Sequence, residues 1–271
     1  MFLSLLHVNT TNRPGRQWLG NVYRVHQRLW MAFPDGKKRE DDEFFLGPWS
    51  GPPISDPKPP RGTAGFLFRI ERDGPARILV QSERRPDWEY ALQNAPHLLS
   101  CPPKLLQFNP APQRDQAYRF RLLAHVVRAR SVAREDRAPR TTRAGLTIAR
   151  RKRVEMPLHP SPVPQSLPND PDQRRQLLSG RWDPWRQWLD QIGGQRGFRP
   201  ADGEGAPLLM QQVHTTVRKP EWDQPKRYNG GLFEGVLVCT DSDRLRAAIV
   251  NGIGHAKAFG FGLLSIAPTG R

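Results

Sequence analysis

The same order of apolar patterns occurs twice along this chain, and this repetition limits the folds that it can adopt. Each half contains a strand pattern, a helical pattern, two further strand patterns, a second helical pattern and a last strand pattern. In the first half these segments lie at 2–9, 21–33, 65–73, 76–84, 87–93 and 104–108. In the second half they lie at 118–127, 183–194, 213–222, 230–240, 243–254 and 262–268. The sequence therefore predicts two similar modules rather than one large sheet.

Local signals support this order of elements. The apolar residues of 21–33 recur at helical spacing, and Asp241 or Ser242 is suited to cap the last helix. The order βαββαβ is that of the ferredoxin-like fold, which RRM-type RNA-binding modules share. We therefore expect an α+β protein with two tandem ferredoxin-like (RRM-like) domains, at residues 1–112 and 113–271.

The charge of the chain indicates a polyanionic partner. Its 42 Lys and Arg residues outnumber its 26 Asp and Glu residues, which gives a formal net charge of +16. Nucleic acid is the first candidate partner and an acidic membrane surface is the second. No apolar run approaches the roughly 20 residues that a spanning helix needs, so we expect no membrane partner. The N-terminus lacks the basic region and the cleavage site of a signal peptide, so we expect a cytoplasmic protein. As a free protein it is expected to be a monomer.

Metal and cofactor sites are not indicated by the sequence. Cys101 and Cys239 are the only cysteines, and they form no C-x-x-C motif. No two of the seven histidines stand at the i, i+4 spacing of a helical metal site. We expect chemistry without a metal or cofactor, although ligands brought together by folding remain an alternative.

A basic segment interrupts the second module. Residues 128–153 contain ten Lys or Arg residues and two acids, so they carry a net charge of +8. Such a run is often only a solvated surface. Because 145–156 alternates in polarity, we interpret it as a β-hairpin arm whose guanidinium groups contact phosphates and base edges. The predicted RNA-binding residues of this arm are Arg128, Arg130, Arg150, Arg151, Lys152 and Arg153.

A glycine-rich run precedes the last predicted strand. The stretch NGIGHAKAFGFG, at 251–262, is not a P-loop, because no Ser or Thr follows its lysine. Its glycines are suited to close approach by an RNA backbone, although a flexible helix-to-strand connection explains them equally well. The residues assigned to RNA binding here are Gly252, Gly254, His255, Lys257, Gly260 and Gly262.

These segments together resemble those of the CasE endoribonucleases, which process CRISPR precursor transcripts in type I-E systems. The resembling pieces are YRVHQRLWMAFP, GFLFRIER, ARILVQSE, YRFRL, FEGVLVCTD and GIGHAKAFGFGLLSIAP, in the expected order along nearly the whole chain. The resemblance implies two ferredoxin-like domains that bind a repeat stem-loop, cut at its 3′ base without a metal, and keep the product beside other Cascade subunits. The chain departs from the family at 35–61, a longer proline-rich loop, and at LAHVV, where an Ala-Asn-Pro turn is typical.

Metal-free cleavage needs a base for the 2′-hydroxyl, an acid for the leaving 5′-oxygen and positive charge near the phosphorane. It yields a 2′,3′-cyclic phosphate and a 5′-hydroxyl. A lone helical histidine is usually a bystander, but Tyr23 lies one turn before His26, and the resemblance also favours a catalytic role. We assign His26 as base or acid, with the choice open, and Tyr23 as its helper. Arg28 or Lys257 is expected to stabilise the transition state.

Three other functions fit part of this pattern. A non-catalytic protein of RRM-like fold would bind the stem-loop without cutting it. A metal-dependent nuclease or polymerase-like domain would need a carboxylate pair, which the predicted site lacks. A ribosome-associated protein would prefer ribosomal RNA fragments to a hairpin.

Overall fold

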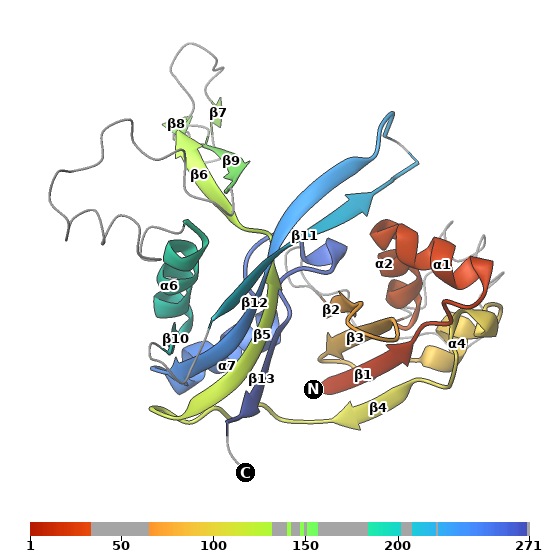
Figure 1. Cartoon of the computed structure of the whole chain (residues 1–271), viewed down its shortest axis with the longest axis horizontal. Coiled ribbons are helices and arrows are strands. Elements are labelled where there is room, and N and C mark those ends of the chain that lie inside the picture. The colour runs from red at the N-terminus through yellow and green to blue at the C-terminus, as the bar shows by residue number, and fades with distance from the viewer. Residues whose placement is uncertain are drawn as a thin grey trace, which may run out of the picture.

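The structure is a computed structural model that describes residues 1–33, 65–131, 140–141, 147–148, 151–156, 184–201, 208–220 and 222–269. The proline-rich loop predicted at 35–61 and Arg150 lie outside the described residues. Figure 1 shows two sheets side by side, with a narrow two-stranded arm projecting from one of them. Within the described part of the chain, no helix is both long enough and apolar enough to cross a membrane.

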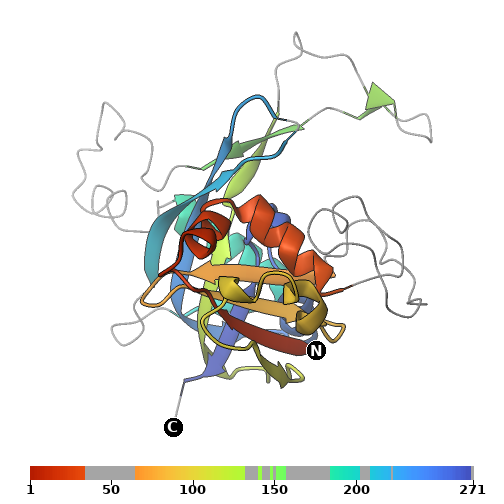
Figure 2. The ribbon, with the colours of Figure 1, turned by 90° about the vertical axis from the view of Figure 1, so that its right-hand side faces the viewer.

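The first sheet contains β1 (Phe2–His7), β2 (Phe66–Glu71), β3 (Arg77–Ser82) and β4 (Lys104–Gln107). Its order is β2-β3-β1-β4, and every neighbouring pair is antiparallel. Its helices are α1 (Arg13–Gly20), α2 (Val22–Met31), α4 (Trp88–Leu92) and the 3-10 helix η1 (Pro96–Leu98). Helices α1 and α2 lie over one face of the sheet (Figure 2), because Val25 and Leu29 share a buried core with Phe68 and Ile78.

The second sheet contains β5 (Ala117–Ala124), β10 (Phe198–Pro200), β11 (Leu209–Val217), β12 (Lys226–Cys239) and β13 (Leu264–Pro268). Its order is β10-β12-β5-β13, and β11 also pairs with β12. Its helices are α6 (Pro184–Arg196), α7 (Ser242–Asn251) and the 3-10 helix η4 (Lys257–Phe259). A second core, which includes Trp185, Leu189, Leu237 and Ile249, joins the helices to the strands.

Both sheets have the strand order of the ferredoxin-like fold, in which the first strand lies between the third and the fourth. The expectation of two tandem ferredoxin-like modules is therefore confirmed. The described residues from β1 to β4 form the N-terminal unit, and those from β5 to β13 form the C-terminal unit. The boundary between residues 112 and 113 stays a prediction.

Several boundaries differ from the sequence predictions. Helix α1 was not predicted, although Asn12 caps it by accepting a hydrogen bond from the Gly15 amide at 2.7 Å. Helix α6 continues past Gly193 and Gly194, where the predicted segment 183–194 ends, and stops at Arg196. The reason is packing: a Cβ atom on Gly193 would lie 2.7 Å from the Phe198 carbonyl oxygen, so this glycine serves a close contact rather than a helix end.

The basic arm forms from strands farther apart in the chain than expected. Strand β6 (Val127–Ser131) pairs with β9 (Arg151–Glu155), and β7 (Arg140–Thr141) pairs with β8 (Thr147–Ile148). The hairpin predicted within 145–156 is therefore wrong in register, because β9 pairs with a strand that continues from β5. Arg130 lies opposite Lys152 in this ladder, and Arg128 lies opposite Val154.

Buried polar side chains fasten the N-terminal unit to the backbone of the C-terminal unit. Arg69 is 3% exposed and donates to the carbonyls of Arg121 and Leu263, both at 3.2 Å. Gln81 is also 3% exposed and donates to the carbonyl of Ile249 at 2.6 Å. Because an unsatisfied buried donor costs about 1–3 kcal/mol, these bonds favour one relative placement of the two units.

Candidate active site

His26 lies on α2 with its ring packed against an aromatic layer. Its ring centroid is 5.3 Å from that of Phe66 and 6.0 Å from that of Phe68, both in stacked geometry, and 5.6 Å from that of Trp30. The two phenylalanines share one face of β2, since residues two apart along a strand point the same way. His26 is not one of the buried core residues of α2, which include Val25. A separate aromatic surface orients its ring.

The surroundings of His26 favour the neutral imidazole. Burial, followed by the positive charge of Lys219, lowers the pKa of His26 from 6.5 to about 4. Its Nδ1 atom is buried and has no hydrogen-bond partner within the described residues. At neutral pH the ring is therefore uncharged and able to accept a proton. An anion bound beside it would raise the pKa of His26, because negative charge stabilises the imidazolium.

Lys219 brings a positive charge from the C-terminal unit to α2. Its Nζ atom lies 5.1 Å from the ring centroid of Tyr23 and 5.2 Å from that of Trp222, within the range of cation–π contacts. Lys219 was not predicted as a site residue, because the sequence pattern of 213–222 indicates one continuous strand. Strand β11 instead ends at Val217, and Lys219 lies in the turn that leads to β12.

The two cations expected to stabilise the transition state are engaged elsewhere. Arg28 donates to the carbonyl of Ala91 at 3.1 Å and to Oδ1 of Asn94 at 2.8 Å, so it joins α2 to the α4 region. Lys257 donates to the carbonyl of Asn251 at 2.6 Å, at the end of α7. Burial lowers the pKa of both groups. Their contacts with RNA stay predictions.

The glycine-rich segment packs closely against the N-terminal unit. A Cβ atom on Gly252 would lie 2.8 Å from the Leu67 side chain, and one on Gly260 would lie 3.3 Å from the Phe68 ring. Both glycines are buried and have positive φ. Docking of the two units therefore explains these glycines without a ligand. Contact with RNA stays a prediction for Gly252, Gly254, His255, Gly260 and Gly262.

A polar cluster holds the base of the arm. Nε2 of His125 lies 2.9 Å from Oε1 of Glu155. The Asn229 amide donates to the same Oε1 atom at 3.1 Å, and Nδ2 of Asn229 donates to Oε2 at 2.6 Å. Burial acts to raise the pKa of Glu155, but these hydrogen bonds lower it overall, so the carboxylate is ionised at neutral pH. An isolated β-bridge between His125 and His255 places the glycine-rich segment beside this cluster.

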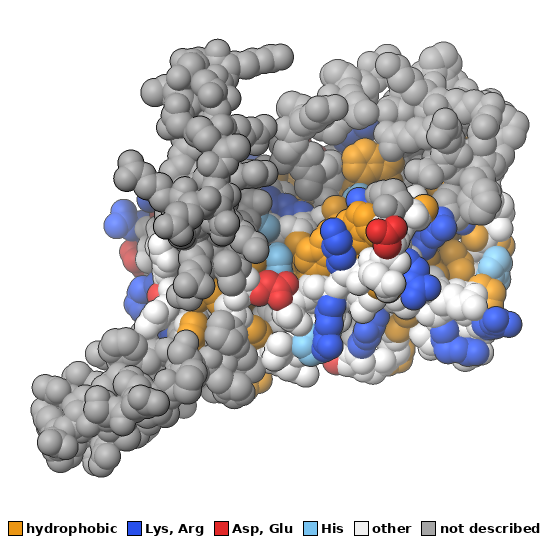
Figure 3. All heavy atoms as spheres, turned by 90° about the horizontal axis from the view of Figure 1, so that it is seen from above, with side chains coloured by type: hydrophobic (Ala, Val, Ile, Leu, Met, Phe, Trp, Pro, Cys, Tyr) orange, Lys and Arg blue, Asp and Glu red, His pale blue; other side chains and the backbone are white. Residues whose placement is uncertain are grey.

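The face above α2 and the β11–β12 hairpin mixes positive and apolar side chains (Figure 3). A second lysine makes a cation–π contact with Trp222 here, since Nζ of Lys226 lies 4.3 Å from the ring centroid. Cations beside aromatic rings are suited to phosphate and base contacts with RNA. The predicted arm residues Arg128, Arg130, Arg151, Lys152 and Arg153 lie on β6 and β9, and their RNA contacts stay predictions.

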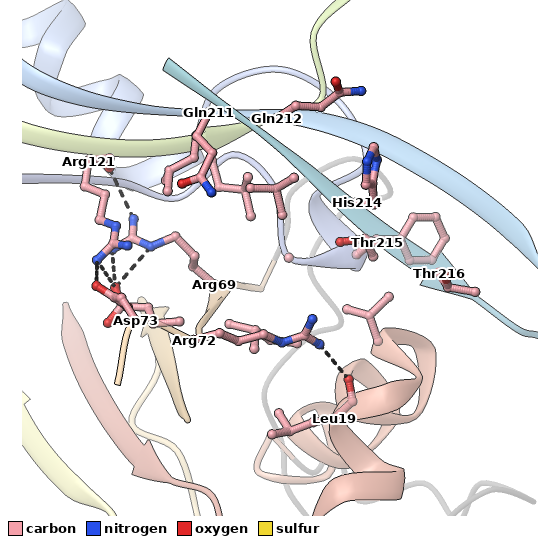
Figure 4. Close-up of a pocket in the computed structure, with 18 of the residues that line it drawn as sticks. Leu19, Arg69, Arg72, Asp73, Arg121, Gln211, Gln212, His214, Thr215 and Thr216 are labelled. Atoms are coloured by element: carbon pink, nitrogen blue, oxygen red, sulfur yellow. Dashed lines mark hydrogen bonds and ion pairs between the residues drawn. The ribbon is translucent and has the colours of Figure 1, made fainter. Parts of the chain in front are cut away.

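A cleft of about 600 Å³ separates β11 from the hairpin of β2 and β3. Figure 4 shows Arg121 donating to Asp73 near one end of the cleft, at 2.8 Å, and Arg72 reaching the carbonyl of Leu19 elsewhere in its lining, at 3.1 Å. The residues that line this cleft do not include His26. The cleft and the surroundings of His26 are therefore two distinct features of the contact between the N-terminal and C-terminal units.

Potential metal ligands are dispersed in the described part of the chain. No group of three or more His, Cys, Asp or Glu side chains is placed there to hold a metal ion. Cys101 is exposed, Cys239 is buried, and both are free thiols. Cleavage without a metal or cofactor stays a prediction.

Comparison with known proteins places the whole chain in a family. A family model described as "CRISPR associated protein" matches residues 1–268. The CRISPR-associated endoribonuclease Cse3 of Thermus thermophilus is 29% identical over 274 residues, which cover 99% of this chain and 100% of that protein. A structure of Cse3 bound to a 19-nucleotide RNA has a TM-score of 0.60 at 27% identity, covering 99% and 100% of the two chains. A Thermus thermophilus Cse3 complex with an RNA that represents a pre-cleavage state has a TM-score of 0.58 at 26% identity, covering 98% of each chain.

Proposed function

The chain belongs to the CRISPR-associated protein family, and on this premise we propose that it is an endoribonuclease that cuts CRISPR repeat RNA at the 3′ base of the stem-loop. The observation that carries this proposal is the neutral imidazole of His26, oriented by aromatic rings on the helix that also bears Tyr23. The relatives that share the fold over the whole chain include proteins named as endoribonucleases.

His26 acts as the general base in this mechanism. Its neutral ring takes the proton from the 2′-hydroxyl, the 2′-oxygen attacks the adjacent phosphorus, and the bond from phosphorus to the 5′-oxygen breaks. The leaving 5′-oxygen takes a proton from the His26 imidazolium or from water, so the products are a 2′,3′-cyclic phosphate and a 5′-hydroxyl. Tyr23 orients the 2′-hydroxyl or donates to a phosphate oxygen.

The arm and the glycine-rich segment hold the RNA. Basic residues on β6 and β9 supply phosphate contacts, and the cluster around Glu155 fixes the arm near the last loop of the C-terminal unit. The partners are the precursor and mature CRISPR RNA and the other Cascade subunits. The product stays bound, and the protein acts in the cytoplasm as two domains, 1–112 and 113–271.

Cleavage of a repeat stem-loop in EDTA tests the proposal. Sequencing the RNA that copurifies with the protein identifies the repeat, and end-labelled substrate then reveals the cut site and the cyclic phosphate. We expect His26→Ala to abolish cleavage while stem-loop affinity persists, and His97→Ala, an exposed histidine on η1, to cleave normally. Binding without cleavage by the wild-type protein would instead establish a non-catalytic RNA-binding protein.

A further inference from the structure

We propose that the cleft between β11 and the β2–β3 hairpin binds single-stranded RNA that flanks the stem-loop. Arg72 holds a phosphate in this arrangement, and side chains of β11 contact the nucleotide beside it. This inference rests on the proposed endoribonuclease function and adds to it a second RNA site, separate from His26. The ligand is an unpaired segment on the 5′ or the 3′ side of the stem-loop, since both sides offer the same phosphates and bases.

Arg72 brings into the cleft a positive charge that no carboxylate balances. It follows β2 and is exposed, and its Nη2 atom donates to the carbonyl of Leu19 at 3.1 Å, so the side chain extends along the cleft (Figure 4). Within the described part of the chain, no Asp or Glu pairs with it. A guanidinium group has five N–H donors, so one hydrogen bond to a carbonyl leaves others for a phosphate.

The other acidic and arginine side chains of the lining are already paired. Arg69 forms an ion pair with Glu71 at 2.7 Å, and Arg121 forms one with Asp73 at 2.8 Å. The charges of these four groups cancel, and that of Arg72 remains in excess. A cleft lined by an excess of positive charge attracts an anion.

The β11 wall of the cleft is polar but uncharged. Gln211 and Thr215 lie on one face of β11, because residues an even number of positions apart in a strand point the same way, and Arg72 lies across the cleft from them (Figure 4). Neither side chain forms a hydrogen bond to another described residue. Amide and hydroxyl groups both donate and accept, so they match the base edges and 2′-hydroxyls of RNA.

Apolar side chains complete a site of the kind that holds unpaired nucleotides. Leu232 and Phe259 also line the cleft and are half-buried, so a base placed there would cover them. Proteins that bind single-stranded RNA combine cations for the backbone with apolar or aromatic surface for the bases. The cleft volume of about 600 Å³ suits an enclosed ligand, whereas duplex RNA is contacted on its outer surface.

The cleft reaches the start of the helix that bears the proposed catalytic residues. Val22 lines the cleft, and Tyr23 is the next residue of α2. Cleavage at the base of a stem-loop places the scissile phosphate where paired RNA becomes single-stranded. An unpaired strand therefore leaves the stem near α2, and a second site for that strand would add to the affinity of the first.

Binding titrations with three RNAs test the inference: the repeat stem-loop alone, and the stem-loop with a short unpaired extension on its 5′ or on its 3′ side. A 2′-deoxy nucleotide at the cut removes the attacking hydroxyl, so each RNA stays intact. We expect Arg72→Met to weaken binding of one extended RNA about tenfold, because a hydrogen bond to a charged group contributes on that order. Binding of the stem-loop alone should not change. The salt slope for the extended RNA should fall by about 0.7, as expected for one phosphate of a single strand.

Arg16→Met is the matched control for the lost charge. Arg16 is an exposed arginine of the same unit that donates to the carbonyls of Thr10 and Thr11, both at 2.8 Å, and it does not line the cleft. This variant should bind all three RNAs as the wild type does. Gln211→Met removes hydrogen-bonding groups without a charge, so it should weaken binding of the same extended RNA and leave the salt slope unchanged.

The outcomes distinguish this inference from the function on which it rests. A wild-type protein that binds the stem-loop but does not cut unmodified RNA overturns the endoribonuclease function, and the three titrations still decide whether the cleft binds RNA. A wild-type protein that binds none of the three RNAs overturns both. If Arg72→Met binds both extended RNAs as the wild type does, or binds all three RNAs equally weakly, the inference is overturned.

Two further variants complete the test. Wild-type affinity of Gln211→Met for both extended RNAs overturns the contact assigned to β11. If Arg72→Met lowers the melting temperature, Arg72→Lys decides, because it keeps the positive charge and should bind the extended RNA more tightly than Arg72→Met. Affinity as low as that of Arg72→Met, with the fold retained, overturns the phosphate contact.

Discussion

The side chain of Asn21 holds the backbone of Arg218 through both of its polar atoms. Nδ2 donates to the Arg218 carbonyl at 2.9 Å, and Oδ1 accepts from the Arg218 amide at 3.2 Å. Arg218 belongs to the β11–β12 turn of the C-terminal unit, whereas Asn21 is the N-cap of α2. The helix with His26 and the turn with Lys219 are thereby held in one geometry.

Substitution of Asn21 should separate capping from positioning. Serine is a good N-cap but is too short to reach both groups of Arg218, whereas alanine supports neither role. We expect Asn21→Ala to lose about 1 kcal/mol of unfolding free energy, and Asn21→Ser to lose less. Both variants should cleave slowly, because misplacement by about 1 Å can cost as much as ~100-fold in rate. Thermal melts and single-turnover rates measure the two effects, and a wild-type rate for Asn21→Ser would refute the positioning role.

The pKa of His26 makes the stability of the fold depend on pH in a defined direction. This pKa is about 4 in the folded chain and ordinarily 6.5, so between these values the unfolded chain binds the proton more readily. The contribution of His26 is complete above pH 6.5 and is lost as the pH falls towards 4. The slope is at most about 1.4 kcal/mol per pH unit.

Urea unfolding of the wild type and of His26→Gln between pH 4 and pH 7 measures this contribution. Glutamine does not titrate, so the variant should lack the additional loss of unfolding free energy at low pH. Identical pH slopes for the two proteins would contradict the burial of a neutral imidazole at this position.

Local patterns predicted most of the elements because the forces behind them are local. The sequence predicted a helix that begins at Gly20 or Asn21 and a last helix capped by Asp241 or Ser242, and the structure has N-caps at Asn21 and Asp241. Helix α1 was not predicted, because its eight residues contain two glycines and few apolar positions. The sequence does contain a helix-start signal for α1: Asn12 is a good N-cap residue, and the proline that follows it closely is suited to a first helical turn.

The candidate site was predicted only where its residues share one helix. Tyr23 and His26 are neighbours in sequence, so their common surface follows from helical spacing. Lys219 reaches them through the docking of two units, which no local pattern encodes. The same reason explains Gly252, whose need for glycine arises from Leu67 on the other unit.

Gly252 and Gly254 provide a matched test of this docking. Both have positive φ, and Gly252 (φ 70°, ψ 166°) lies in a region almost restricted to glycine, so alanine at either position meets backbone strain of about 1–3 kcal/mol. Only Gly252 is crowded: its Cβ atom would lie 2.8 Å from Leu67, whereas the nearest atom to a Cβ at Gly254, on Trp188, is 3.9 Å away. Gly252→Ala should therefore lose about 1–3 kcal/mol more unfolding free energy than Gly254→Ala. Equal losses in denaturant titrations would show that the contact between the units is not tight.

The cluster at the base of the arm should control affinity for RNA rather than the rate of cleavage. Glu155 accepts hydrogen bonds from His125 and Asn229, and glutamine would present its amide group to one of these donors. Loosening the arm should weaken stem-loop binding about tenfold, which corresponds to roughly 1.4 kcal/mol. Removal of a negative charge alone would strengthen binding to RNA, so the expected change has the opposite sign.

Glu234→Gln is the control for that charge, since Glu234 pairs with Arg121 at 3.1 Å on β12 and does not touch the arm cluster in the described residues. Salt-dependent binding titrations should show weaker affinity and a shallower salt slope for Glu155→Gln, because fewer basic side chains of β6 and β9 then reach phosphates. Cleavage at saturating RNA should be unchanged in both variants. Affinity of Glu155→Gln equal to that of Glu234→Gln would show that the arm binds RNA independently of its base, or does not bind it.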